Sequence, residues 1–251
     1  MYEEYAAAAE QIRPFVADTG RMLHGILAKG GSVMFEGAQG TMLDIDHGTY
    51  PFVTSSSATA GGAATGTGVG PTAIGTVISV TKAYVTRVGG GPFPTEIHDA
   101  VGEVLRARGH EYGAVTGRPR RCGWLDIPML RYSNHVNGAE WLVVTKLDVL
   151  DELEEIPVCV GYEIDGKITD ETPADVEGLE AIKPRYTTLK GWHEPTEGIT
   201  EYDKLPKPAR EYLAFQERES GAKIGMISTG PDREQTIVLP EFAAALHSVT
   251  S

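Results

Sequence analysis

Apolar side chains recur along this chain at helical spacing in four segments. The first segment, residues 3–29, is broken or kinked at Pro14, because proline removes a backbone donor from the helix. Three further helices are expected over residues 96–108, 125–137 and 209–218.

Short continuous apolar runs predict buried strands between these helices. We expect such strands over residues 32–36, 141–144 and 222–227, and strand-like structure among the apolar residues between 74 and 88. The first strand leads into a glycine turn at residues 37–40, the kind of turn at which open α/β sheets bind ligands. Helices alternating with strands predict an α/β fold, and with no clear boundary we expect a single domain over residues 1–251.

Two segments are less regular. Residues 158–168 predict a β-hairpin that turns at Asp165-Gly166, and residues 169–208 are polar, interrupted by prolines and expected to be irregular. Six glycines fall within residues 61–75, which is typical of a flexible linker. We favour an ordered segment, because strand-like residues follow it at once.

Composition narrows the class of protein. The chain is 41% hydrophobic and 23% charged, with a net charge of −13, so it is a poor candidate for non-specific binding to nucleic acid or membrane. Any anionic ligand then needs a local basic cluster. No run reaches the ~18 apolar residues of a membrane helix. The acidic start and the two cysteines, which form no Cys-x-x-Cys pair, predict a reducing, cytoplasmic location.

The sequence Thr145-Lys146-Leu147-Asp148 follows a predicted buried strand and suits a loop that reads guanine. An ionised carboxylate such as that of Asp148 has only acceptors, and guanine offers it two parallel donors, whereas adenine presents an acceptor. Lys146 can lay its alkyl stem along the base while its charge stays in water. The alternative is a strand followed by a solvated turn.

Three arginines, Arg118, Arg120 and Arg121, lie within four positions beside glycine and proline. Guanidinium groups bind carboxylate and phosphate through paired hydrogen bonds, so this loop is the candidate anion site. The alternative is a salt-bridged surface turn. Gln39 can read a purine edge, because its amide both donates and accepts, or it is an ordinary turn residue.

Two polar clusters are weaker candidates for ligand binding. Residues 54–57, a Thr-Ser-Ser-Ser run, can hold phosphate at a following helix start or simply cap that helix. Asp44, Asp46 and His47 are metal-ligating types, but their spacing matches no standard metal motif, so hydrogen bonds within the fold are expected. The sequence has neither a Gly-x-Ser-x-Gly elbow nor a Gly-x-x-x-x-Gly-Lys-Ser/Thr phosphate loop.

Taken together, these segments resemble the adenylosuccinate synthetase family. The resemblance covers essentially the whole chain and is carried by residues 35–54, 87–95, 116–126, 145–151 and 227–233, in the family's order and spacing. It implies a mostly parallel central sheet flanked by helices, related to the P-loop NTPases, with the family's N-terminal part missing.

The resemblance also implies an activity. Members of the family are ligases of purine biosynthesis that use GTP and Mg²⁺ to join IMP and L-aspartate, through 6-phosphoryl-IMP, into adenylosuccinate, the first committed step from IMP to AMP. They act in the cytoplasm as homodimers, with small-molecule substrates and neither nucleic acid nor membrane as partner.

Matching positions take roles from the family. IMP-binding residues would be Gln39, Thr54, Val88 and Arg118. The aspartate-binding loop would be Ala114, Val115, Thr116, Gly117, Arg118, Pro119 and Arg120. GTP-binding residues would be Arg120, Lys146, Leu147, Asp148, Ser228, Thr229 and Gly230.

Three departures from the family pattern matter. Val115 replaces a frequent threonine, and Pro119 stands where some members have a basic residue. The family's N-terminal phosphate loop, with its catalytic aspartate and magnesium contact, and the histidine acid that follows are not found in this sequence. We therefore identify no catalytic residue and no metal ligand, and expect turnover to need the missing part. The alternative is a non-catalytic module that binds guanine nucleotide or IMP, or that associates with a full-length homologue.

Overall fold

The computed structural model describes residues 1–113 and 117–250, with side chains up to residue 246. Its centre is a sheet in the order β1-β4-β8-β9. The strands β1 (Ile78–Lys82), β4 (Trp141–Thr145) and β8 (Lys223–Ser228) run parallel, and β9 (Thr236–Val238) is antiparallel to β8. The prediction of a mostly parallel α/β sheet is confirmed.

The register of this sheet brings the carboxyl ends of its three parallel strands to one edge. Lys82 is opposite Thr145, and Val144 is opposite Ile227. Between β4 and β8 the register shifts once, since Leu142 is opposite Ile224 while Val143 is opposite Met226. Gly225 is the residue that this shift skips.

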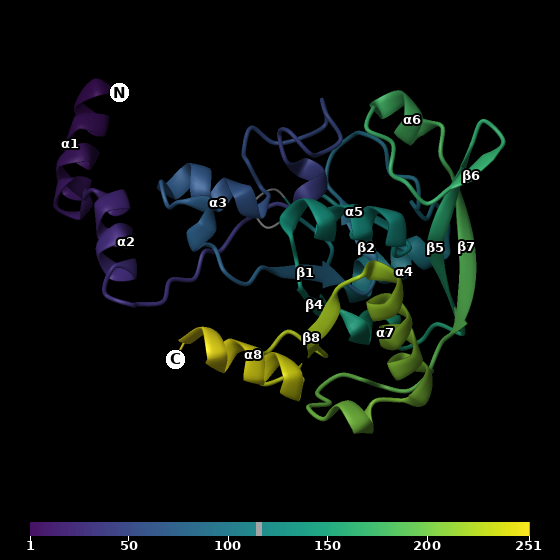
Figure 1. Cartoon of the computed structure of the whole chain (residues 1–251). Coiled ribbons are helices and arrows are strands. Elements are labelled where there is room, and N and C mark those ends of the chain that lie inside the picture. Colours follow the sequence, from purple (N-terminus) through teal and green to yellow (C-terminus); the bar gives the residue numbers. More distant parts are fainter. Residues whose placement is uncertain (114–116, 251) are drawn as a thin grey trace.

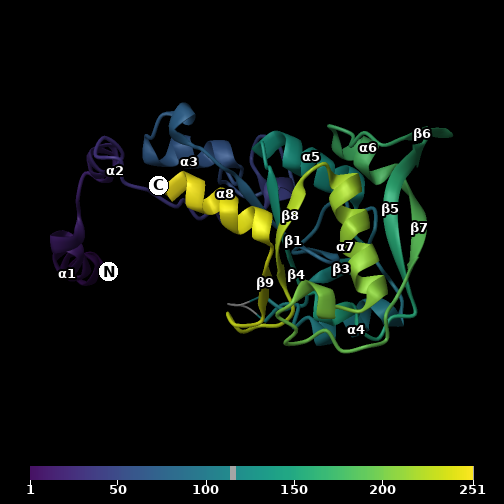
Figure 2. The same cartoon turned by 60° about the horizontal axis from the view of Figure 1, so that its bottom comes forward.

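Helices cover both faces of the sheet. The helix α8 (Pro240–Thr250) packs on β8 from one side, and α7 (Lys207–Ser220) packs on it from the other (Figure 2). α5 (Ile127–Asn137) lies beside α7, and α4 (Ala100–Arg108) contacts the sheet's carboxyl end. α4 and α5 begin a few residues later than expected, because the Asp99 and Asp126 carboxylates cap them.

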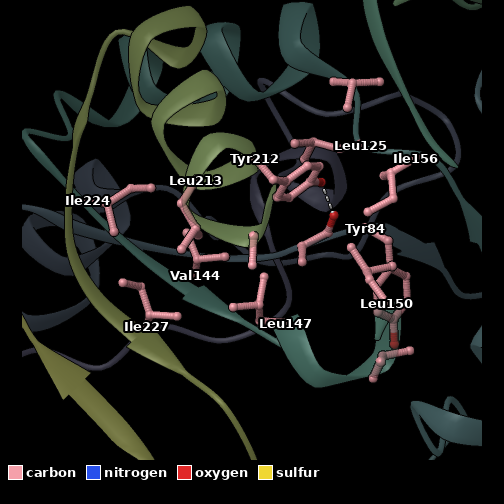
Figure 3. Packing of buried hydrophobic residues seen from close by; sticks show 14 of the residues in the cluster. Tyr84, Leu125, Val144, Leu147, Leu150, Ile156, Tyr212, Leu213, Ile224 and Ile227 are labelled. Atoms are coloured by element: carbon pink, nitrogen blue, oxygen red, sulfur yellow. Dashed lines mark hydrogen bonds between the residues drawn. The ribbon is translucent and has the colours of Figure 1, made fainter. Parts of the chain in front are cut away.

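The main hydrophobic core lies between β4, β8 and α7 (Figure 3). Val144, Leu147 and Ile227 are fully buried, as is Leu213 of α7. Tyr212, also buried, donates its hydroxyl to the carbonyl of Ala83 and so satisfies its one polar atom inside the core. Truncating a buried leucine here would cost about 2–5 kcal/mol.

A second, antiparallel sheet lies on the outer side of α5 and α7 (Figure 2). Its order is β6-β5-β7, made by β5 (Glu155–Ile164), β6 (Lys167–Thr169) and β7 (Lys183–Lys190). The expected hairpin turn is confirmed, with Asp165 and Gly166 both at positive φ. A short pair of strands, β2 (Val85–Arg87) and β3 (Arg121–Gly123), completes the sheets.

The expectation of an irregular segment over residues 169–208 was wrong in part. The segment contains α6 (Val176–Glu180), the eight-residue strand β7 and a 3₁₀ turn, Tyr202–Lys204. β7 pairs with β5 along its whole length, and that tertiary pairing outweighs a sequence rich in proline and charge.

The N-terminal helices stand away from the sheets (Figure 1). α1 (Tyr2–Ile12) and α2 (Thr19–Leu27) are separated by a 3₁₀ turn that contains Pro14, as predicted. None of the helices in the described residues is long and apolar enough to cross a membrane.

Residues 32–36 do not form the buried strand that we expected. Met34 is 87% exposed, and no strand among the described residues pairs with this segment. Among the strands of the described residues, β1 has a neighbour on one side only, and its Val80 is 71% exposed. An apolar run becomes a strand only where another strand supplies hydrogen bonds. The linker interpretation of residues 61–75 was wrong, because α3 (Ala60–Thr67) and the 3₁₀ turn Pro71–Ala73 occupy them.

Candidate functional site

Charged and polar residues follow each of the three parallel strands at the carboxyl edge of the central sheet. Lys82 ends β1, Lys146 follows β4 and Ser228 ends β8. Because the neighbouring strands are in register, the loops that begin at these residues lie side by side. Ligands of open α/β sheets bind at this edge.

The loop after β4 holds a half-buried carboxylate. Lys146 has φ +63°, which turns the chain sharply, and the buried Leu147 anchors the 3₁₀ helix Leu147–Leu150. Burial raises the pKa of Asp148, and apart from its own backbone N–H no described residue donates a hydrogen bond to its carboxylate. A half-buried acceptor of this kind is suited to a ligand that brings its own donors.

Two cations fix the position of this loop. Lys146 Nζ donates to the carbonyl of Gly109 at 3.0 Å, and Arg108 Nη2 donates to the backbone carbonyl of Asp148 at 3.3 Å. Arg108 is the last residue of α4, and Gly109 follows it directly. The hydrogen bond of Arg108 goes to the backbone and leaves the Asp148 carboxylate untouched.

The loop after β8 is held by its buried threonine. Thr229 is fully buried and donates its hydroxyl to the carbonyl of Ile199 at 2.9 Å. Ser228 Oγ donates to the carbonyl of Gly230 at 2.9 Å. A Cβ on Gly230 would lie 2.2 Å from Gln235 Oε1, so a larger residue here would have to displace the end of the Gln235 side chain. These hydrogen bonds hold the loop that follows β8 at the carboxyl edge of the sheet.

The three arginines predicted as one anion cluster take separate places. Arg121 is bound to Glu96 and to the carbonyl of Gly91, so for this residue the salt-bridged alternative is correct. Arg118 is exposed, and no described residue bonds to its side chain. Arg120 is half-buried and forms an ion pair with Glu111 at 3.0 Å.

Glu111 is a buried carboxylate at the centre of this region. Its Oε1 accepts hydrogen bonds from Lys82 Nζ and Tyr84 Oη, both at 2.6 Å. Burial opposes its ionisation, but the hydrogen bonds from Lys82 and Tyr84 and the charges of Lys82 and Arg120 outweigh burial and hold the pKa of Glu111 below its usual value. The group is therefore a buried anion among cations at neutral pH.

A second group of loops surrounds Arg87 at the end of β2. Its Nη2 donates to Thr49 Oγ1 at 2.9 Å and to the carbonyl of Phe52 at 3.0 Å, while Nε donates to the carbonyl of Gly90 at 2.9 Å. A Cβ on Gly91 would lie 2.6 Å from Phe52 Cβ. These contacts bring together the chain around Thr54 and Val88, two of the sequence-predicted residues.

The remaining predicted residues are less closely connected. Gln39 is exposed at φ +65°, and no contact among the described residues joins it to the loops above. Leu147 packs in the core. Ala114, Val115 and Thr116 lie outside the described residues, and Gly117 and Pro119 are exposed beside them.

Asp44 organises its own loop, as expected. Its carboxylate accepts the backbone N–H groups of Asp46, His47, Ala58 and Thr59. Within residues 1–113 and 117–246, no group of three or more His, Cys, Asp or Glu side chains is placed to hold a metal ion. The helix start expected near residues 54–57 falls at Thr59, which caps α3 without a side-chain bond.

Sequence reasoning missed Lys82, Arg87 and Glu111. Lys82 is the last residue of an apolar strand, and Lys146 directly follows another. A search for cations at strand ends would therefore have identified Lys82. Arg87 also ends a strand, next to glycines. Glu111 is 29 residues from Lys82, and no local pattern marks it.

An open α/β sheet with polar loops at its carboxyl edge defines a protein of the open-sheet α/β class, whose members bind ligands at that edge. Within this class, the chain belongs to the adenylosuccinate synthetase family, whose model matches residues 1–237.

Similar proteins agree with this assignment. The chain is 64% identical to an adenylosuccinate synthetase of Koribacter versatilis over 98% of its length and 56% of that protein. It is 58% identical to one of Solibacter usitatus, covering 94% of the chain and 54% of the relative. A solved structure of fully ligated adenylosuccinate synthetase from Plasmodium falciparum matches with a TM-score of 0.91 at 41% identity, over 94% of this chain and 57% of that one. The chain thus spans a little over half the length of these proteins.

Proposed function

We propose that this chain supplies substrate recognition to an adenylosuccinate synthetase, a cytoplasmic and homodimeric ligase. The reaction joins IMP and L-aspartate to adenylosuccinate at the expense of GTP, through 6-phosphoryl-IMP, in the first committed step from IMP to AMP. Family membership supports the reaction. The arrangement of the carboxyl edge supports the division of roles among residues.

The observation that carries the proposal is the position of Asp148. Its carboxylate is half-buried, receives no hydrogen bond from another described residue, and follows β4, the strand that pairs with β8 just before Ser228. Guanine would satisfy it with the N1–H and the 2-amino group. Adenine would leave it desolvated and unpaired, a penalty that can support strong discrimination. Lys146 would lie along the base.

In this proposal, IMP and aspartate bind on the side of the Arg118–Arg120 loop that faces away from the loop after β4. Thr54 would bind the IMP phosphate, Val88 would lie near the ribose, and Gln39 would contact the base. Arg118, which is exposed, would reach IMP and aspartate. Arg120, which is paired with Glu111, would bind the GTP phosphates. The aspartate loop, residues 114–120, falls largely outside the described residues.

Mg²⁺ accompanies GTP in the family, but the described residues do not form a metal site of their own. We therefore assign neither a metal ligand nor a catalytic acid or base to this chain. What its residues do in the proposal is bind and orient: Asp148 selects the base, Arg120 holds phosphate, and Arg87 fixes the loops around IMP. The non-catalytic module is not favoured, because the similar proteins above are named as synthetases.

Binding of GDP and ADP to the purified chain tests the proposal. Titration calorimetry should give tighter binding of GDP, and Asp148→Ala should remove the preference while the circular dichroism spectrum stays unchanged. Asp203→Ala is a matched control, because that carboxylate is 96% exposed and its ion-pair partner is Arg210 of α7. Equal affinity of the unaltered chain for GDP and ADP would refute guanine recognition.

Turnover needs a separate assay. Adenylosuccinate formation is measured with GTP, IMP, aspartate and Mg²⁺, omitting each in turn, with and without a separately produced N-terminal part of a relative. Activity that appears on mixing would support the recognition role. Activity of the chain alone, dependent on all four components, would mean that an acid and a base must be sought among its own residues.

A further inference from the structure

We propose that Glu111 is a positioning residue that orients Arg120 toward the phosphates of the bound nucleotide. This inference rests on the proposed function, because it takes the nucleotide to lie on the loop after β4. Glu111 is a buried carboxylate that no local sequence pattern marks as a site residue.

The side chain of Glu111 is 2% exposed and is shared by three elements. Lys82 comes from the end of β1, Tyr84 from the turn between β1 and β2, and Arg120 from the chain that enters β3. Two of these donors bind Oε1 at 2.6 Å, and Arg120 Nη1 binds Oε2 at 3.0 Å. Lys82 and Tyr84 therefore fix the carboxylate, and the fixed carboxylate in turn fixes the guanidinium.

The backbone around Arg120 is held independently of the Glu111 side chain. The Arg120 N–H donates to the carbonyl of Glu111 at 2.9 Å, and the Glu111 N–H donates to the carbonyl of Arg106 at 2.9 Å. Arg106 Nε closes the ring by donating to the carbonyl of Arg120 at 2.8 Å. A change confined to the carboxylate should thus alter where the guanidinium points and leave the chain in place.

Arg120 keeps binding capacity beyond this pair. Its side chain is 32% exposed, Nη1 is engaged by Glu111, and Nε is buried without a partner among the described residues. A guanidinium held at one nitrogen presents its other N–H groups in a fixed direction. If the cation is already fixed before the ligand arrives, less conformational entropy is lost on binding. The anion therefore binds more tightly.

Electrostatics alone gives the opposite expectation for Glu111. The charges of Lys82, Arg120 and Lys146 interact in this region, and Glu111 is the anion that offsets them. If its charge were all that mattered, neutralising it would strengthen phosphate binding. If it positions Arg120, neutralising it will weaken phosphate binding. The sign of the change separates the two roles.

The test is titration calorimetry of Glu111→Gln with guanosine and with GDP. Glutamine keeps the length of the side chain but has one acceptor oxygen for three donors. GDP affinity should fall on the order of tenfold, the effect of one charge-assisted hydrogen bond, while guanosine affinity stays unchanged. Glu96→Gln is the matched control, since it removes the carboxylate partner of the adjacent Arg121, whose side chain is held by carbonyls as well.

A double variant shows whether Glu111 acts through Arg120. Arg120→Ala should lose GDP affinity, and adding Glu111→Gln should cause no further loss, because the oriented group is already gone. If Glu111→Gln does not fold, Glu111→Asp keeps the charge that the buried donors require, yet is too short to hold all of them. It should show a smaller loss in the same direction.

Three results would overturn the inference: GDP binding that is unchanged or tighter in Glu111→Gln, an equal loss of guanosine and GDP, or additive effects in the double variant. Failure of the proposed function is visible separately, as equal binding of GDP and ADP by the unaltered chain. The comparison of nucleoside with nucleotide then still reports on Glu111. Absence of all nucleotide binding would overturn both.

Discussion

Lys146 Nζ donates a hydrogen bond of 3.0 Å to the carbonyl oxygen of Gly109 and so joins the loop after β4 to the end of α4. The bond draws the alkyl stem of Lys146 across the top of the sheet. Glu111 lies two residues beyond Gly109, so the loop after β4 and the ion pair of Arg120 are held by one short segment of the chain. In the proposed function, base and phosphate recognition both depend on this segment.

Lys146→Ala should weaken GDP binding about tenfold, because it removes both the stem beneath the base and the bond to Gly109. Alanine adopts φ +63° with the same difficulty as lysine, so the backbone strain is unchanged. The free energy of unfolding should fall by only about 1 kcal/mol. Calorimetry and urea unfolding measure the two effects, and Lys190→Ala, on the exposed face of β7, is the control. Unaltered GDP affinity would contradict this role.

Arg87→Ala should weaken binding at the proposed IMP side of the site and leave binding at the proposed GTP side nearly unchanged. The variant loses the bonds to Thr49, Phe52 and Gly90 that hold the chain around Thr54 against the chain around Val88. IMP affinity should fall about tenfold or more, while GDP affinity stays within about twofold, since the described contacts of Arg87 do not reach Asp148. Binding of both ligands is measured on the same preparation, with Arg185→Ala as the control. Parallel losses would show that the two halves are one cooperative unit.

Asp151→Ala should destabilise the fold and change ligand selectivity little. The Asp151 carboxylate accepts hydrogen bonds from Trp192 Nε1 at 2.7 Å and from Thr196 N and Oγ1 at 2.8 and 2.7 Å. Alanine leaves these buried donors unpaired, which should cost about 3 kcal/mol in urea unfolding. Glu152→Ala, at an adjacent side chain that is 72% exposed, should cost less than about 0.5 kcal/mol. Similar losses for both variants would argue against the buried network.

A second buried carboxylate gives the fold a dependence on pH. Asp126 caps α5 and accepts the hydroxyl of Tyr162 at 2.5 Å, while its Oδ2 is buried without a hydrogen-bond partner among the described residues. Burial raises the pKa of Asp126 to about 6, against the lowering effect of the hydrogen bonds from Tyr162 and Met129. The folded state therefore binds this proton more tightly than the unfolded chain does.

Asp126 should stabilise the fold fully below about pH 4 and lose this contribution as pH rises through about 6. The free energy of unfolding of the unaltered chain, minus that of Asp126→Asn, should thus decrease over this range by on the order of 1–3 kcal/mol. Asparagine keeps the cap and the acceptor for Tyr162 without the titration. Urea unfolding at a series of pH values measures the difference, and a flat difference would show that Asp126 stays ionised.

Much of the fold could be predicted from periodicity, because the signal lies within each segment. The break at Pro14, the strand before Thr145 and the hairpin turn at Asp165 all depend on neighbouring residues. The failures depended on distant ones. Residues 32–36 have the composition of a strand without a described partner, and β7 lacks that composition but pairs with β5.

In the candidate site, too, some features could be predicted from the sequence and others depend on distant residues. That the loops after β4 and β8 begin at the same edge of the sheet was predictable, because carboxyl ends of parallel strands converge there. The separation of Arg120 from Arg121 was not, since it depends on Glu111 and Glu96, which are nine and 25 residues away. Adjacent arginines look equivalent in a sequence, and only the carboxylate that each one meets distinguishes them.

The register shift at Gly225 gives a residue of α8 influence over ligand geometry. If Gly225 took a regular place opposite Val143, the later residues of β8 would advance by one position, about 3.3 Å, and their side chains would turn to the opposite face. Ser228 would then come opposite Lys146 instead of Thr145. A Cβ on Gly225 would lie 2.5 Å from the ring of Phe242, so any larger residue must displace that buried ring or change the pairing. Under the proposed function, a mid-strand substitution at Gly225 that touches no ligand should therefore alter nucleotide preference.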